Sequence, residues 1–214
     1  MNNLRLLVGR DPIMFACSAH NGQKRKRLDG SDEPYIRHPV RVAKHAQDLG
    51  APHEAVVAAL LHDVLEDCEV DFSEIVLSFG CIATIVNDLT DKYTVDMCPG
   101  QNRKVRKKLE AERLGECREL SRGIKALDLL DNLTAIPHDA PFMRVFIQEA
   151  IYLMAQMSIQ EPKEIWVRNA FEEVRHVIQL VQELAVGFGT DEKISKLRSS
   201  ATSNIIAAVE SCAP

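Results

Sequence analysis

Residues 55–67 read AVVAALLHDVLED, and this stretch decides how the chain folds and which chemistry it offers. Its apolar first half is continuous enough for a helix that is buried on most sides. If the helix continues, His62 lies one turn before Glu66. Asp63 likewise lies one turn before Asp67, so each pair projects on one side. Burying these ionisable groups beside a core costs free energy unless a cation or donors compensate them. The stretch therefore indicates a divalent metal, with a solvated acidic helix end as the alternative.

The rest of the chain shows the same helical periodicity. Apolar residues recur at spacings of three and four, strict alternation is absent, and aromatic residues make up only 5% of the chain. No heptad repeat persists, which excludes a long coiled coil. We expect an all-α protein, an irregular multi-helix bundle, with one domain at 1–186 and a helical extension at 187–214 packed on or beside it. The expected helices are 12–22, 34 or 39 to 50, 52 onward through the quoted stretch, 73–79, 81–91, 101–114, 117–135, 140–159, 162–186 and 190–209, with a loop at 21–33.

Composition bounds the partners and the compartment. The net charge of −5 argues against a DNA or RNA partner, because a general nucleic-acid binder is basic as a whole. A local basic pocket for a phosphorylated small molecule is compatible with this charge. The six cysteines stand singly, the N-terminus has no export-type apolar run, and no apolar run approaches the roughly 20 residues of a bilayer span. We expect a soluble cytoplasmic protein without a membrane partner, and the oligomeric state stays open.

Two further segments supply residues that suit a metal site. In PYIRHP, residues 34–39, His38 stands between a turn and a new helix, where it is either a ligand or a capping or core histidine. In KALDLLDNL, residues 125–133, Asp128 lies in an apolar helix and needs a partner, with Asn132 one turn on. Two imidazoles and two carboxylates form a mixed nitrogen and oxygen set that suits Mn, Fe or Zn and leaves room for water.

Taken in order, these segments resemble the hydrolase domain of the RelA/SpoT family, a group of HD-type metal-dependent phosphohydrolases. The resemblance is strongest to the small stand-alone metazoan members, and it covers about residues 12–160. A lone His-Asp pair is weak evidence, whereas the ordered series is specific. The series is FA at 15–16, His20, QKRK at 23–26, YIRHP at 35–39, ALLHD at 59–63, ED at 66–67, FG at 79–80, TD at 90–91, Lys125, Asp128 and NL at 132–133.

The resemblance implies roles for the residues of the series. A single ion both lowers the pKa of a bound water and polarises phosphorus, and two nearby carboxylates handle the protons. Mn²⁺ is the ion that the resemblance implies, with Fe²⁺, Zn²⁺ and Mg²⁺ as alternatives. Glu66 and Asp67 would orient or deprotonate the attacking water and assist the leaving group. The implied metal ligands are His38, His62, Asp63 and Asp128.

The resemblance also implies a substrate pocket beside the metal site. Arg25 and Lys26 lie in the basic run at 24–27, which either gathers phosphates and contacts a base or is a solvated charge run. The second basic run, at 103–108, is expected to be mostly solvated, with one member reaching the pocket. The resemblance also places Asn132 in the pocket and Arg144 near a distal phosphate.

Several positions depart from the family pattern. The loop after Gln23 is longer, Leu129 stands where a lysine is usual, Asp131 replaces a common aromatic residue, and Gln148 stands where small members tend to have tyrosine. We expect these departures to change the pocket and to leave the metal site alone. Metal-dependent hydrolysis is therefore better supported than any particular substrate.

The leading hypothesis is a hydrolase that removes the 3′-pyrophosphate from guanosine tetra- or pentaphosphate. The first alternative is the same apparatus acting on another nucleotide or phosphorylated metabolite, such as NADPH or an inositol-type phosphate. The second is a nucleotide-binding domain without turnover, against which the intact pair of Glu66 and Asp67 argues.

Overall fold

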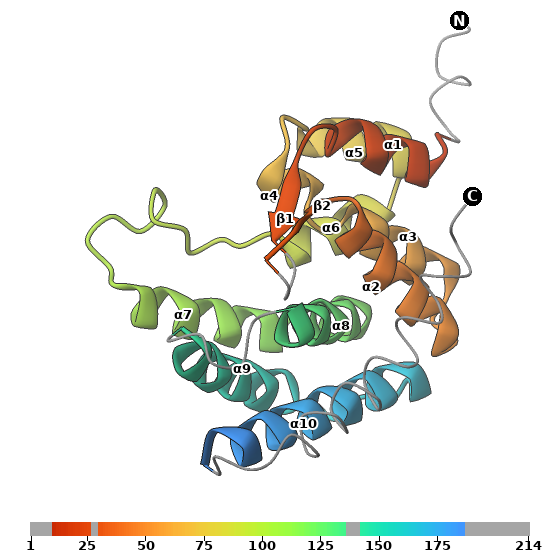
Figure 1. Cartoon of the computed structure of the whole chain (residues 1–214). Helices are drawn as coiled ribbons and strands as arrows, with labels where there is room; N and C mark the ends of the chain where they lie inside the picture. The colour runs from red at the N-terminus through yellow and green to blue at the C-terminus, as the bar shows by residue number, and fades with distance from the viewer. Residues whose placement is uncertain (1–9, 27–29, 136–141, 187–214) are drawn as a thin grey trace, which may run out of the picture.

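The computed structural model describes residues 10–26, 30–135 and 142–186, and within them the chain is helical (Figure 1). The all-α class is confirmed. The helices are α1 (Pro12–Ala19), α2 (Arg37–Asp48), α3 (His53–Leu61), α4 (Val64–Asp67), α5 (Phe72–Phe79), α6 (Ile82–Leu89), α7 (Arg103–Gly115), α8 (Glu119–Ala135), α9 (Met143–Met157) and α10 (Ile165–Val186).

Helix ends follow the local chemistry of the sequence. The Asp11 side chain accepts a hydrogen bond of 2.9 Å from the backbone N–H of Ile13, with Pro12 at the first helical position of α1. Asn102 caps α7 in the same way, accepting from Val105 at 3.0 Å. Capping side chains satisfy backbone donors that have no partner within the helix. These two helix starts are therefore encoded locally.

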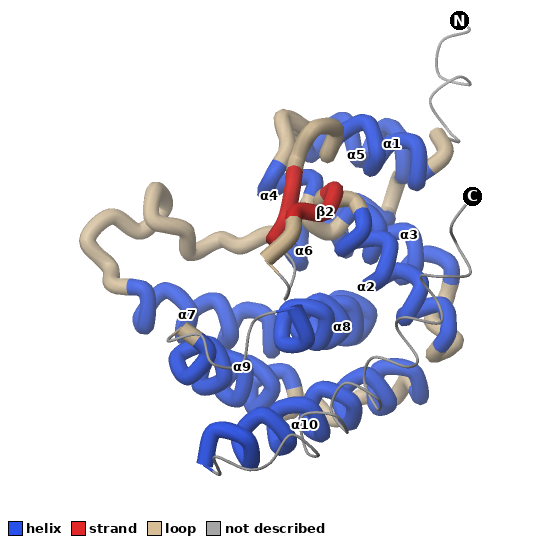
Figure 2. The backbone as a smooth tube through the Cα atoms, in the orientation of Figure 1, coloured by secondary structure: helices blue, strands red, loops and turns tan. Residues whose placement is uncertain are grey.

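Two predictions about local structure are wrong. The loop expected at 21–33 contains an antiparallel hairpin of β1 (Lys24–Lys26) and β2 (Asp32–Pro34), shown red in Figure 2. The continuous helix expected through residues 62–67 is interrupted, because α3 ends at Leu61 and α4 begins at Val64. A ring nitrogen of His62 lies 2.8 Å from the carbonyl of Ala59, and such a side-chain bond competes with the backbone ladder of the helix.

Helix α8 lies at the centre of the fold. It has α2 and α3 on one side and α9 and α10 on the other (Figure 1). Buried apolar side chains such as Leu61 of α3, Leu127 of α8 and Phe171 of α10 belong to one core cluster. Gly123 lets α10 approach closely, since a Cβ there would lie 2.4 Å from Cη2 of Trp166. Helix α8 therefore contributes side chains both to the apolar core and to a cluster of polar side chains around Asp128.

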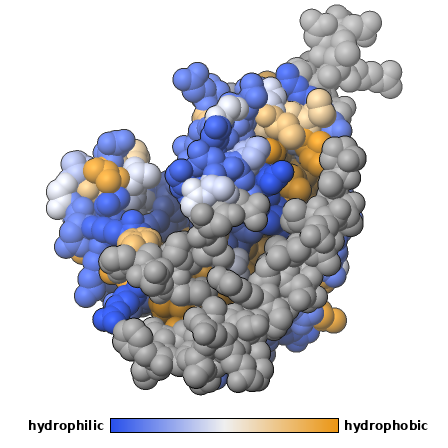
Figure 3. Space-filling view, viewed as in Figure 1, coloured by the Kyte–Doolittle hydropathy of each residue, from blue (hydrophilic) through white to orange (hydrophobic). Residues whose placement is uncertain are grey.

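Hydrophilic residues dominate the described surface on the face drawn in Figure 3. None of the helices in the described ranges has the combination of length and apolarity that a bilayer crossing requires. The predicted extension at 187–214, including the helix expected from residue 190, lies outside the described residues, so the predicted domain division stays a prediction.

Candidate metal centre

Three buried side chains from separate helices meet beside α8. His38 lies in the first turn of α2, His62 directly follows α3, and Asp128 lies in the second half of α8. One ligand atom from each lies within 4.8 Å of the others. The exposed fractions of the three are 2%, 2% and 5%, so water does not solvate these groups freely. A buried cluster of this composition needs a compensating charge.

Asp63 brings a second carboxylate to the same point. Its Oδ2 lies 3.1 Å from Nε2 of His62 and 3.5 Å from Nε2 of His38. The hydroxyl of Tyr35 donates to that oxygen at 2.8 Å and fixes the carboxylate in place. The structure thus brings together all four residues that the sequence singled out as ligands.

The outer nitrogens of both imidazoles are occupied, which leaves the inner nitrogens facing the centre. Nδ1 of His62 lies 2.8 Å from the Ala59 carbonyl, and Nδ1 of His38 lies 2.7 Å from Oδ2 of Asp131. Because both partners only accept, each Nδ1 carries a proton, so in the neutral ring the lone pair is on Nε2. Nε2 of His62 is buried and has no hydrogen-bond partner. The residues therefore fit a divalent cation at this point.

The electrostatics of the cluster agree with a cation site. Burial alone lowers the pKa of His62, but the charges of Asp63 and Asp128 outweigh it and hold the pKa well above its usual value. Burial raises the pKa of Asp63, yet the neighbouring His62 brings it down to about 2. Both shifts show that the two carboxylates favour positive charge between them. A metal ion supplies that charge without a proton.

Glu66 and Asp67 lie on α4, directly after the cluster, and both residues are partly open to solvent. Although α3 ends at Leu61 and α4 begins at Val64, the backbone N–H of Asp67 donates to the carbonyl of Asp63 at 2.8 Å, so Asp67 still lies one turn beyond Asp63. The Glu66 carboxylate accepts from the backbone N–H of Asp91 at 3.2 Å. Partial burial and the negative charge of Asp91 raise its pKa, which suits a proton acceptor.

The predicted substrate residues divide into two groups. Arg25 of β1 donates to Oδ1 of Asn132 at 2.9 Å, and Asn132 donates to Oδ1 of Asp128 at 2.6 Å. These two side chains therefore join the hairpin to the cluster. Lys26 forms its ion pair with Asp32 across the hairpin, and Arg144 is exposed in the first turn of α9. The Lys26 ion pair therefore does not involve the cluster.

The structure adds residues that the sequence did not single out. The expectation that the departures leave the metal site alone is wrong for Asp131, which bonds His38 and also pairs with Arg41. A signal was present, because Arg41 and Asp131 each follow a predicted ligand by three residues, one helical turn. From the second basic run, Lys107 pairs with Asp91 at 2.7 Å.

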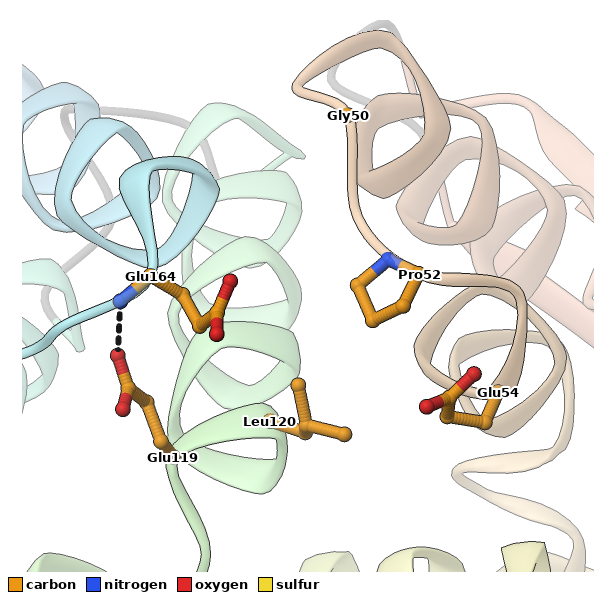
Figure 4. A pocket seen from close by; sticks show the side chains of 6 residues that line it. All are labelled: Gly50, Pro52, Glu54, Glu119, Leu120 and Glu164. Atoms are coloured by element: carbon orange, nitrogen blue, oxygen red, sulfur yellow. Dashed lines mark hydrogen bonds between the residues drawn. The ribbon is translucent and has the colours of Figure 1, made fainter.

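A separate pocket of about 470 Å³ lies at the start of α3, α8 and α10 (Figure 4). Glu54, Glu119 and Glu164 are among its lining residues, and none of the candidate ligands is. The backbone N–H of Glu164 donates to Glu119 at 2.6 Å. Three carboxylates repel a phosphorylated ligand, so this pocket does not compete as the site of phosphate chemistry.

The helical fold and the converging histidines and aspartates define a candidate metal-binding domain of the HD type. A family model described as "HD domain" matches residues 13–120, half of the chain, and the protein belongs to this family. The match ends before Asp128, which the structure brings close to His38 and His62. Two solved structures share the fold at 23% identity.

The first of these structures is described as a metazoan orthologue of SpoT that hydrolyses ppGpp; it has a TM-score of 0.60 and the match covers 77% of this chain and 92% of that one. The second, lmo0812 from Listeria monocytogenes, has a TM-score of 0.54, with 69% and 97% covered.

Three proteins with similar sequences share the same enzymatic name. The MESH1 protein of Xenopus tropicalis, named guanosine-3′,5′-bis(diphosphate) 3′-pyrophosphohydrolase, is 35% identical over 59% of this chain and 68% of its own length. The Danio rerio protein of the same name is 31% identical over 66% of this chain and 76% of its own. A protein of Aquifex aeolicus with the same enzymatic name is 46% identical over 36% of this chain, but that match spans only 10% of its length.

Proposed function

We propose that this protein is a metal-dependent phosphohydrolase that removes the 3′-pyrophosphate from guanosine tetra- or pentaphosphate. The observation that carries the proposal is the buried, unpartnered Nε2 of His62, which faces three further side chains of ligand type. The family and the enzymatic name shared by the relatives support this choice of substrate. The substrate class is a phosphorylated nucleotide, and the net charge of −5 disfavours a nucleic-acid polymer.

The metal would be held by His38, His62, Asp63 and Asp128. Two imidazoles and two carboxylates suit Mn²⁺, with Fe²⁺, Zn²⁺ and Mg²⁺ as the ions to compare. When bound, such an ion acidifies a water molecule and polarises the phosphoryl group. The ligand atoms of His38, His62 and Asp128 already lie close together, so binding costs little rearrangement.

The remaining roles fall to groups beside the cluster. Glu66, with its raised pKa, accepts the proton of the attacking water, and Asp67 on the same short helix assists the leaving group. Arg25 and Lys26 recognise the base and phosphates, with Arg25 held in place by Asn132. Arg144 is proposed to contact the distal phosphate.

The test is release of pyrophosphate from guanosine tetraphosphate by protein that has been stripped with a chelator and reloaded with one metal at a time. We expect turnover to vanish on stripping, to return best with Mn²⁺, and to be absent in Asp63→Ala. The matched control is Asp48→Ala, which removes an exposed carboxylate that pairs with Lys44 on the same helix, α2. Full activity after stripping, or in Asp63→Ala, would overturn the metal mechanism.

A second substrate is favoured by one observation. Asp131 and Arg41 place an ion pair beside Arg25, where the family pattern has an aromatic residue at 131. The alternative is therefore the same chemistry on another nucleotide or phosphorylated metabolite, such as NADPH. A side-by-side assay decides, because loss of phosphate from the other compound while guanosine tetraphosphate stays intact would select it.

We also propose a cytoplasmic location. The cysteines in the described ranges, Cys17, Cys68, Cys81, Cys98 and Cys117, are free thiols, which suits a reducing compartment.

A further inference from the structure

A buried carboxylate lies directly behind one of the candidate ligands. Asp131 follows Asp128 by one helical turn on α8, and its exposed fraction is 7%. Its Oδ2 lies 2.7 Å from Nδ1 of His38, on the side of the ring that faces away from the cluster. An ionised carboxylate only accepts, so it holds the ring proton on Nδ1 and leaves the lone pair of Nε2 free.

The carboxylate is itself held by a guanidinium from the same helix as the histidine. Arg41 follows His38 by one turn on α2 and donates to Oδ1 of Asp131 through Nε at 2.6 Å. It also donates through Nη2 to Oδ2 at 3.1 Å, so the pair has the two-bond geometry that fixes a carboxylate in its plane. The remaining Nη1 pairs with Glu33 of β2 at 2.9 Å. Arg41 thus links two buried carboxylates, Asp131 and Glu33.

The same carboxylate also reaches the hairpin. Nη1 of Arg25 lies 3.5 Å from Oδ2 of Asp131, while its Nη2 donates to Asn132. One side chain of α8 is thus shared by His38, by Arg41 and by the arginine proposed to contact substrate. A simple surface ion pair shows neither this burial nor this set of partners.

We propose that Asp131 is a positioning residue for the metal site. It fixes the tautomer and the ring orientation of His38, so that Nε2 is presented to the cation, and Arg41 in turn fixes Asp131. The inference rests on the proposed metal site and adds a residue to it that does not touch the metal. Carboxylates that hydrogen-bond a ligating histidine raise its basicity and strengthen metal binding.

Glu33 provides the control that separates this role from plain ion pairing. Its exposed fraction is 6%, close to the 7% of Asp131, and it bonds the same guanidinium of Arg41. Glu33 pairs with Arg41, whereas Asp131 also contacts His38. Glu33→Gln and Asp131→Asn therefore remove equivalent buried charges, and only the second weakens the support of the histidine ring.

The experiment compares the full-length wild type, Asp131→Asn and Glu33→Gln after chelation. Mn²⁺ affinity is measured by calorimetry, and the ligand field is followed by the visible absorption of the Co²⁺-loaded proteins. We expect Asp131→Asn to bind Mn²⁺ about 10- to 100-fold more weakly and to alter the Co²⁺ spectrum. Glu33→Gln is expected to keep the wild-type affinity and spectrum.

Other results of this experiment would contradict the positioning role of Asp131. Wild-type affinity in Asp131→Asn, or equal weakening in both variants, overturns the positioning role and leaves the metal site standing. Absence of metal binding by the wild type overturns both this inference and the proposed function. If circular dichroism shows that Asp131→Asn does not fold, Arg41→Gln takes its place, since it keeps the carboxylate but removes what holds it. Weaker Mn²⁺ binding in that variant is expected, and unchanged binding overturns the inference.

Discussion

The two sides of α8 meet their neighbours in opposite ways. Toward α10 the helix presents Gly123, and the absence of a side chain lets the ring of Trp166 lie against the backbone. Toward α2 it presents Asp128, whose carboxylate meets Lys125 at 2.8 Å and His38 at 3.2 Å. The first side stabilises the fold by close apolar packing. The second buries charges at a cost, which indicates that it is kept for chemistry rather than for stability.

The largest expected effect is that of breaking the charged side with Asp128→Ala. The variant removes the carboxylate that pairs with Lys125 at 2.8 Å, and because the Lys125 side chain is 21% exposed we place the cost at or below the roughly 3–5 kcal/mol of breaking a fully buried pair. We expect this loss in the free energy of unfolding of the metal-free protein, measured by urea denaturation, together with complete loss of hydrolysis. An unchanged unfolding free energy would show that the charged side is not buried in solution.

A double variant sharpens the same test. Lys125→Met combined with Asp128→Leu removes both charges and fills the space with apolar groups, which restores stability in many buried ion pairs. We expect the double variant to regain most of the lost unfolding free energy while it stays inactive. A double variant as unstable as Asp128→Ala would contradict the view that the charged side costs stability.

A smaller effect is expected from Gly123→Ala on the apolar side. The added methyl group meets Trp166 at a distance that forces a shift, and overpacking costs about 1–3 kcal/mol. About 1 kcal/mol of helix propensity offsets part of this cost. Thermal unfolding should therefore show a modest fall in stability, while Mn²⁺ affinity stays at the wild-type value. Trp166→Phe replaces the indole with a smaller ring. The double variant Gly123→Ala/Trp166→Phe should therefore lose less stability than the sum of the two single variants.

The smallest expected effect is a shift in the pH profile. Glu66 must be ionised to accept a proton, and partial burial together with Asp91 raises its pKa, so turnover falls at a higher pH than for an ordinary carboxyl group. Asp91→Asn removes the repelling charge and keeps the backbone donor. The acidic limb of kcat at saturating metal should then move to lower pH. When Asp91→Asn is made in a Glu66→Gln background, the acidic limb of the residual kcat should not move. A shift in that background would assign the acidic limb to a group other than Glu66.

The sequence predicts most of the helical architecture because each helix carries its own signals. Asp11 and Asn102 act as caps where their side chains favour a helix start, and apolar spacing gives the interior of α8. The hairpin at 24–34 escapes prediction because strands of three residues are too short to show a period. The break at His62 escapes it as well, since it depends on where one ring places its hydrogen bond.

The candidate ligands were predicted as residue types, and their convergence required the fold. Asp131 shows the limit of that reasoning most clearly. Its spacing from Asp128 is visible in the sequence, but its partner His38 lies 93 residues away, and no local pattern connects the two. The resemblance to a family directs attention to shared positions, so a residue that departs from the pattern is assigned to the wrong part of the site.

That separation of 93 residues also bears on folding kinetics. Contacts between α2 and α8 close a long loop, and the hydrogen bond from Arg25 to Asn132 closes one of 107 residues, so both are entropically costly to form early. We therefore expect the helices and their local pairs to form first and the ligands to meet late, after the transition state. A cation that binds only the assembled ligands then slows unfolding and leaves the folding rate almost unchanged. In this protein the bound metal would therefore lengthen the lifetime of the native state, and it would leave the rate of folding almost unchanged.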